Sequence, residues 1–251
     1  MRGWEDFRIA LAFLTVLPVG RNLPCDASRL ARSMALFPAV GLLLGLLLAV
    51  SNWALQLLLP PLVVAPLVVL LLIRLTGALH LDGLADLADG LAGGRDRESR
   101  LRIMKDCRIG AIGAVALIMA LLLKVAAIYS LPPAVQSATL VLMPASGRWL
   151  QVLLSALCNY ARPEGGTAGA FVDNVGEPQA LFASLTLVVA ALILFGLTGL
   201  WLLLGLAVLA FWLLRHLERQ LGGVTGDALG AATEIAELAT LLLVLALQPM
   251  F

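Results

Sequence analysis

The sequence has little charge. Only 13% of its 251 residues are Asp, Glu, Lys or Arg, whereas 61% are hydrophobic, and the mean hydropathy is +0.99. Soluble domains carry about 25% charged and about 45–50% apolar residues, so this composition excludes an ordinary soluble protein. The formal net charge of +1 says little about partners, and we expect no nucleic acid among them. The composition predicts an all-α, polytopic helical bundle in a lipid bilayer, built as a single domain over residues 1–251.

Cysteine is also scarce. The three cysteines, Cys25, Cys107 and Cys158, have no close spacing that would indicate a zinc site or a redox pair, so we interpret them as incidental. We expect them at or near the cytoplasmic side, where disulfides are rare. The N-terminus lacks the pattern of a cleavable signal peptide, because Glu5 and Asp6 stand where a basic segment would be.

Whole stretches of the chain lack charge, and these predict the membrane spans. No charged residue occurs from Ser33 to Ile73, and Pro60 and Pro61 divide that interval in two. Together with later apolar runs this gives about seven transmembrane helices, at residues 33–59, 62–79, 109–131, 134–157, 179–195, 199–214 and 235–247. The earlier apolar run, residues 7–19, is too short to cross a core of about 30 Å and is expected to be interfacial or re-entrant.

The placement of charge predicts the orientation. Apart from Lys124 and Arg148, the charges fall in or beside the N-terminal region, residues 76–113, the loop near Arg162 and residues 215–237. The alternate connections have none. Because positive residues favour the cytoplasmic side, we expect the charged ends of the spans, and a site among them, to face the cytoplasm.

A row of aspartates follows the second span. Asp82, Asp86 and Asp89 lie at i, i+4 and i+7, so on a helix they share one face, where like charges repel unless a cation lies between them. Hard carboxylate oxygens suit Mg²⁺. The alternative is a solvated, capped helix start, but carboxylates at the rim of a membrane core are functional candidates. His80 is either a hydrogen-bonding partner of this row or takes part in the chemistry.

A second acidic set lies near the C-terminus. Asp227, Glu234 and Glu237 are spaced i, i+7 and i+10, which places them on one helical face, and Thr225 precedes them as a candidate N-cap. Acids near a helix N-terminus also interact well with the helix dipole, which would be a purely structural explanation. Two acidic faces on the same side of the membrane could instead hold one or two metals between facing helices.

Basic residues lie beside the first acidic row. Arg102, Lys105 and Arg108 belong to a basic run that is either a loop setting the topology or a phosphate site leading into a helix N-terminus. Lys124 and Arg148 lie within spans, where each would either pair with an acid or contact a substrate anion.

Long motifs around these residues resemble one known family. The motifs are LHLDGLADLADGL, RIMKDCRIGAIG, GGVTGDALGAATEIAE, FLTVLPV, LFPAVGLLLG and RPEGG, and they cover essentially the whole chain. In them the chain resembles the cobalamin synthase family, the adenosylcobinamide-GDP ribazoletransferases. Cys107 is one departure, because a small hydroxyl residue is expected there.

The resemblance implies a reaction and a set of roles. A hydroxyl of α-ribazole, or of its 5′-phosphate, attacks the phosphate on the cobinamide side of adenosylcobinamide-GDP, and GMP leaves. Mg²⁺ is the implied cofactor, and the bacterial inner membrane the implied location, with the oligomeric state open and a homo-oligomer among the options. The assigned roles are metal binding for Asp82, Asp86, Asp89, Asp227 and Glu234, catalysis for Asp82, Asp227 and His80, and substrate binding for Lys105, Arg108, Arg102, Arg148 and Lys124.

Two alternatives are kept beside this one. The stretch LDGLADLADG is faintly similar to the acidic signature of CDP-alcohol phosphotransferases, although the spacing does not fit. A cation transporter could also place acids and Lys124 in a bundle, but its sites are expected near the midplane, whereas these acids cluster at one rim.

Overall fold

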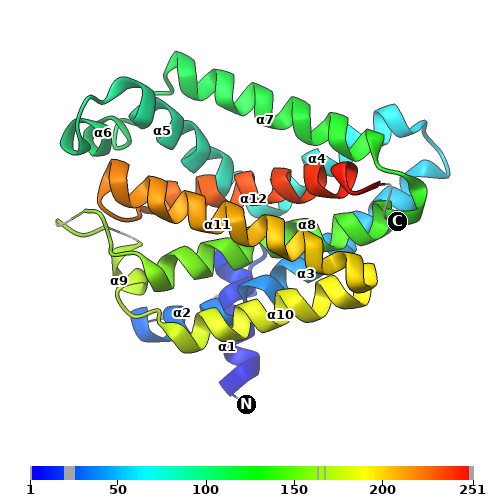
Figure 1. Cartoon of the computed structure of the whole chain (residues 1–251), viewed down its shortest axis with the longest axis horizontal. Helices are drawn as coiled ribbons and strands as arrows, with labels where there is room; N and C mark the ends of the chain where they lie inside the picture. The colour runs from blue at the N-terminus through cyan, green and yellow to red at the C-terminus, as the bar shows by residue number, and fades with distance from the viewer. Residues whose placement is uncertain (1, 20–25, 163, 167, 249–251) are drawn as a thin grey trace.

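The computed structural model describes residues 2–19, 26–162, 164–166 and 168–248, and these are helical nearly throughout (Figure 1). Cys25 lies outside the described residues. The elements are α1 (Arg2–Leu14), α2 (Ala27–Ser33), the 3₁₀ turn η1 (Met34–Leu36), α3 (Phe37–Gln56), α4 (Pro61–Thr76), α5 (Leu79–Gly93), α6 (Arg97–Ile103), α7 (Ala111–Ser130), α8 (Pro133–Leu157), α9 (Gly169–Val172), α10 (Glu177–Phe195), the 3₁₀ turn η2 (Gly196–Thr198), α11 (Gly199–Leu221) and α12 (Gly226–Ala246).

Helix α8 is the centre of the bundle. It packs on α3, α10, α11 and α12, and it is buried along most of its length. Its contact with α3 is close because Gly41 and Gly45 bring that helix onto the α8 backbone, where a Cβ at Gly41 would lie 2.7 Å from the carbonyl oxygen of Pro144. Small residues allow such approaches between helices in a bilayer, so the two glycines are explained by packing.

The lengths and hydropathies of the helices confirm a polytopic bundle. Among the described residues, five helical segments could cross a membrane, or six if the bent pair α4 and α5 forms one span. One of the five is the stretch 177–221, which η2 divides into α10 and α11, and these two helices pack against each other. The predicted total of about seven counted α10 and α11 separately. Helix α1, with 13 residues, is not among the candidate spans.

The second predicted span is broken. Helix α4 ends at Thr76, and α5 leaves it at an angle of 94°. Gly77 (φ 63°) and Ala78 (φ 60°) both adopt the left-handed conformation at the bend, which is uncommon for alanine. The bend directs the aspartate row on α5 away from the axis of α4.

One boundary differs clearly from the sequence-based prediction, because helix α11 continues to Leu221 instead of residue 214. The predicted N-cap Thr225 is confirmed, and the helix that follows it runs without a break from Gly226 into the apolar span predicted at 235–247. The second acidic set therefore lies on the first half of α12.

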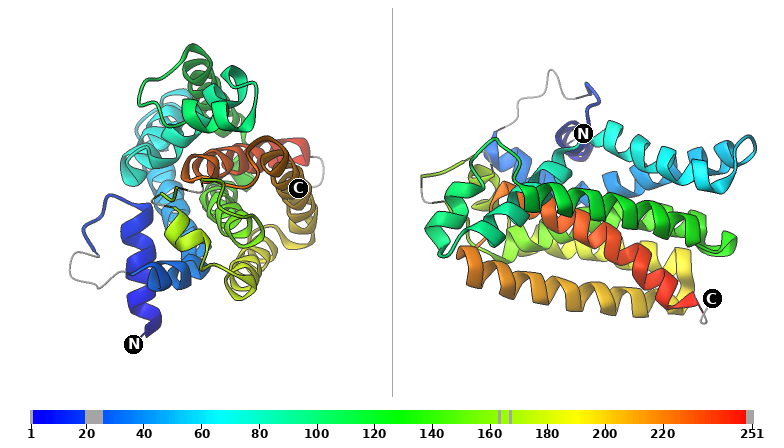
Figure 2. Two further views of the ribbon diagram at one scale, coloured as in Figure 1. Left: turned by 90° about the vertical axis from the view of Figure 1, so that its left-hand side faces the viewer. Right: turned by 90° about the horizontal axis from the view of Figure 1, so that it is seen from above.

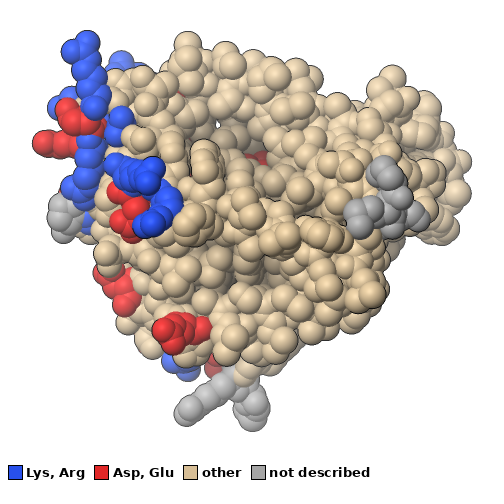
Figure 3. All heavy atoms as spheres, in the orientation of Figure 1, with Lys and Arg blue, Asp and Glu red and all other residues tan. Residues whose placement is uncertain are grey.

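Charge gathers at one end of the bundle. Helices α5 and α6 and the loop before α9 lie at this end, whereas the α3–α4 and α7–α8 connections lie at the other (Figures 1 and 2). Figure 3 shows the Lys, Arg, Asp and Glu side chains at the same end, with the rest of that face almost free of them. Exposed apolar side chains such as Leu122, Ile193 and Phe211 cover the sides, as expected of a surface that faces lipid.

Candidate active site

The N-terminal turns of α5 and α12 meet at the charged end. A Cβ on Gly83 would lie 2.9 Å from the Cα of Asp227, and one on Gly230 would lie 3.3 Å from the Cα of His80. The two glycines thus let the helix backbones touch. Thr225 caps α12 by accepting a hydrogen bond from the amide of Ala228 (3.1 Å).

This crossing brings acids from both rows together. Gly83, next to Asp82, lies against the backbone of Asp227, and Asp82 and Asp227 line the same cavity, while Asp86 follows Asp82 by one turn of α5. Arg162 donates a hydrogen bond from Nη2 to Oδ2 of Asp227 (2.8 Å). The structure therefore places Asp82, Asp86 and Asp227 in one acidic cluster beside one arginine, as facing helices were expected to do.

The cluster has the right donors for a hard cation. Within the described residues, no group of three or more His, Cys, Asp or Glu side chains is arranged to hold a metal by itself. Mg²⁺ does not require one, because it keeps several waters and is usually held by one or two carboxylates together with substrate phosphates. Asp82 and Asp227, which line one cavity, fit that requirement as a pair of carboxylates.

A cavity of about 260 Å³ opens beside the cluster. It is lined by Asp82, Asp227 and the buried side chains of His80 and Gln151, with Gly226 and Gly230 on the α12 side. In the described part of the chain, His80 Nε2 and Gln151 Oε1 have no hydrogen-bond partner. Buried polar atoms are rarely left unpaired, so both atoms are explained if a ligand or water occupies the cavity.

Asp89 lies on the same helix but makes different contacts. Its Oδ2 accepts a hydrogen bond from the amide of Gly110 (2.7 Å), and its Oδ1 accepts one from the amide of Gly113 (2.8 Å). Amides at the N-terminus of a helix have no acceptor within that helix, so Asp89 caps α7 by accepting from two of them. Its assignment as a metal ligand stays a prediction, and the cap contacts compete with it.

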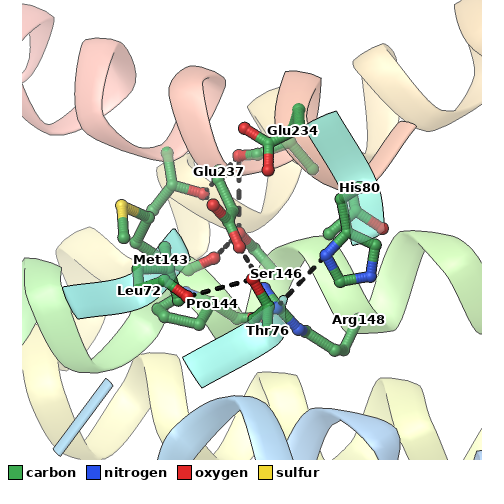
Figure 4. A network of polar contacts seen from close by, with 12 residues as sticks. Leu72, Thr76, His80, Met143, Pro144, Ser146, Arg148, Glu234 and Glu237 are labelled. Carbon is green, nitrogen blue, oxygen red and sulfur yellow. Dashed lines mark hydrogen bonds and ion pairs between the residues drawn. The ribbon is translucent and has the colours of Figure 1, made fainter. Parts of the chain in front are cut away.

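A buried network of charged side chains and His80 links helices α5, α7, α8 and α12 behind the cavity (Figure 4). Lys124 of α7 donates to Glu234 (2.7 Å) and to Glu237 (2.6 Å) of α12. Arg148 of α8 donates to Glu237 and lies 3.5 Å, Nη2 to Nδ1, from His80 of α5. Of the alternatives that the sequence left for Lys124 and Arg148, the structure shows pairing with acids.

The basic residues of the rim make exposed ion pairs. Lys105 donates to Glu164 (2.5 Å), which lowers the pKa of Glu164, and Arg108 donates to Asp106 (2.7 Å), which lowers the pKa of Asp106. Arg102 lines two cavities, of about 440 Å³ and about 650 Å³. These side chains are available to anions, and their role in substrate binding stays a prediction.

Sequence reasoning missed two side chains of the site. Arg162 pairs with the acidic cluster, and Gln151 lines the cavity. The motif RPEGG could have indicated Arg162, because its arginine stands in a loop on the same side as both acidic rows. Gln151 had no local signal, since a single amide in an apolar helix predicts nothing about its neighbours.

Comparison with known proteins identifies the family. Residues 6–245 match the family described as cobalamin-5-phosphate synthase. The chain belongs to this family. The curated proteins to which this chain is similar are named adenosylcobinamide-GDP ribazoletransferase. They include proteins from Ectopseudomonas mendocina (46% identical over 239 residues, 94% of this chain and 96% of the relative) and Syntrophobacter fumaroxidans (45% over 239 residues, 93% and 95%).

A third ribazoletransferase, from Desulforamulus reducens, is 40% identical over 243 residues, 96% of both chains. No solved structure matches the chain. Membership of the cobalamin-5-phosphate synthase family confirms the resemblance drawn from the sequence motifs. We therefore prefer this family over the two alternatives, a CDP-alcohol phosphotransferase and a cation transporter.

Proposed function

We propose that this chain is an adenosylcobinamide-GDP ribazoletransferase acting in cobalamin biosynthesis. The observation that carries the proposal is the meeting of Asp82, Asp86 and Asp227 beside Arg162, next to a cavity with unpaired polar atoms. A site rich in carboxylates, with arginine beside it, suits the transfer of a diphosphate-linked group better than it suits acyl or redox chemistry.

In the proposed reaction, a hydroxyl oxygen of α-ribazole, or of its 5′-phosphate, forms a new bond to the phosphorus on the cobinamide side of adenosylcobinamide-GDP. The bond from this phosphorus to the bridging oxygen breaks, and GMP leaves with that oxygen. The products are adenosylcobalamin, or its 5′-phosphate, and GMP. The hydroxyl proton passes to a carboxylate of the cluster, for which Asp82 and Asp227 are the candidates because they line the cavity.

The chain's own residues divide the remaining work. Arg162, which pairs with Asp227, would contact an oxygen of the transferred phosphate. Lys105, Arg108 and Arg102 lie at the rim, where they would bind the nucleotide end of the diphosphate. When bound at the acidic cluster, Mg²⁺ would neutralise negative charge on the diphosphate and on the leaving GMP.

The proposed location is the bacterial inner membrane with the site on the cytoplasmic side. The support is the gathering of charge at one end of the bundle together with the preference of positive residues for that side (Figure 3). Soluble nucleotide substrates would then reach the cavity without crossing the bilayer.

The direct test is GMP release by the purified protein in detergent, with adenosylcobinamide-GDP, Mg²⁺ and either α-ribazole or its 5′-phosphate. We expect GMP only when a nucleophile is present, in amounts equal to the corrinoid product. Ion flux into liposomes containing the protein should be absent. Metal-dependent flux without any transfer product would overturn the proposal in favour of a transporter.

A further inference from the structure

His80 lies between the cavity and the buried ion network. It is 2% exposed, it is one of the residues that line the cavity, and it contacts Arg148 of the network. Nδ1 lies 3.5 Å from Nη2 of Arg148, whereas Nε2 is buried and has no hydrogen-bond partner among the described residues. Figure 4 shows the imidazole of His80 turned toward Arg148.

The contact with Arg148 determines which nitrogen carries the proton. A guanidinium group has only donors, so the Nδ1 that it approaches has to accept. In a neutral imidazole the other nitrogen then carries the hydrogen. Nε2–H is therefore a donor that lacks an acceptor among the described residues, on a histidine that lines the same cavity as Asp82 and Asp227.

The network behind Arg148 keeps this arrangement in place. Arg148 is 0% exposed and is held by Glu237, which Lys124 also contacts. Lys124 is held in turn by Glu234, so two cations and two carboxylates match one another among the described side chains. Breaking one buried pair leaves an uncompensated charge, which makes the position of Arg148 costly to change.

We propose that Lys124, Glu237 and Arg148 position His80 so that its Nε2–H donates a hydrogen bond to a phosphate oxygen of the substrate in the cavity. His80 is then a donor to the diphosphate and not the base that accepts the hydroxyl proton, and Arg148 is a positioning residue. This assignment rests on the proposed ribazoletransferase activity for the identity of the phosphate. The tautomer itself can be measured without any turnover.

The first experiment is ¹⁵N NMR of histidine-labelled protein in detergent. The chain has two histidines, His80 and His216, so His216→Gln leaves the signals of His80 alone. We expect the neutral Nε2–H tautomer in the unliganded protein, and a mixture of both tautomers in Arg148→Gln. An Nδ1–H tautomer or an imidazolium in the unliganded protein would overturn the proposal.

The second experiment compares two substitutions of His80. The amide of glutamine can place an N–H donor near the position of Nε2, but it cannot act as a base. We expect His80→Ala to lose about 10²–10³-fold in the rate of GMP release, as when an oxyanion donor is removed, and His80→Gln to stay within about 10-fold of the unsubstituted chain. The matched control His216→Gln should be unchanged.

The outcomes separate this inference from the proposed function. If His80→Gln inserts normally but is as inactive as His80→Ala, the donor role is wrong while the ribazoletransferase activity stands. If the unsubstituted chain releases no GMP, the proposed function fails, and the NMR result alone decides whether Arg148 sets the tautomer. If a variant does not insert into the membrane, the ¹⁵N NMR measurement on the unsubstituted protein still decides whether His80 is the Nε2–H tautomer.

Discussion

Helix α12 carries two kinds of carboxylate. Asp227, in its first turn, lies in a cluster with Asp82 and Asp86 and contacts one arginine, Arg162. Glu234 and Glu237, two to three turns farther along, are paired with Lys124 and Arg148. The first group has surplus negative charge, whereas the second is matched. Matched charges hold helices in register, and surplus carboxylates leave room for a cation and a substrate.

The largest expected effect is on the surplus side. Asp82→Asn should lower the rate of GMP release by about 10²–10³-fold or more, because a carboxylate that faces the reacting phosphate is lost. Asp82 is exposed, so the melting temperature in detergent should not fall. Near-normal turnover in the inserted variant would remove Asp82 from the essential residues.

A change on the matched side should instead affect stability. Glu237→Gln leaves Arg148 and Lys124 with less compensating charge, so we expect a loss of roughly 3–5 kcal/mol in the free energy of unfolding. Glu234→Gln is the matched control, since Lys124 then keeps Glu237, and its loss should be smaller. Equal losses of unfolding free energy in both variants would contradict this arrangement, in which Glu237 pairs with two cations and Glu234 with one.

The same control tests a sequence-based assignment. Glu234 was predicted to be a metal ligand, but in the structure it holds Lys124. If Glu234→Gln retains most of the magnesium-dependent rate, its role is in the network. If the rate is lost while the fold is retained, the original assignment stands, and the surplus and matched groups are less distinct than the contacts suggest.

The effect of Mg²⁺ on the melting temperature should distinguish the acidic cluster from the buried ion network. A ligand that binds only the folded state stabilises it by about 2.7 kcal/mol at 100 times its dissociation constant. We therefore expect Mg²⁺ to raise the melting temperature of the unsubstituted chain and of Glu234→Gln, but not that of Asp82→Asn. An equal rise in all three proteins would place the metal away from the acidic cluster.

The sequence predicted the spans well where apolar runs end at proline or charge. The run 109–131 became α7 at Ala111–Ser130, because glycine precedes it and two prolines follow. The start of α12 was also predicted, from Thr225 as an N-cap and the helical spacing of the acids after it. The sequence did not show which acids Lys124 and Arg148 would pair with, because these partners lie about 90 to 110 residues apart along the chain.

The neighbours of the aspartates were predictable in part. The helical spacing predicted Asp82 and Asp86 on one face of α5, and the structure brings Asp227 to the same cavity as Asp82. Asp89 has the same spacing, yet its carboxylate caps α7, 21 and 24 residues farther along the chain. Periodicity gives the face of a helix, but the partner of each side chain depends on tertiary packing.

The smallest expected effects belong to the exposed rim pair Lys105–Glu164. Lys105 lowers the pKa of Glu164, so the pair is present above the ordinary pKa of a glutamate and is lost as the pH falls through the lowered value. Because exposed pairs exchange easily, a substrate phosphate would compete with Glu164 for Lys105.

Lys105→Ala should therefore raise KM for adenosylcobinamide-GDP by about 2–5-fold, and Glu164→Gln, which frees the lysine, should lower it by a similar factor. Neither change should alter the melting temperature, in contrast to Glu237→Gln. Steady-state kinetics at fixed ionic strength measure both. If the two substitutions shift KM in the same direction, Glu164 itself contacts the substrate and the rim pair is part of the site.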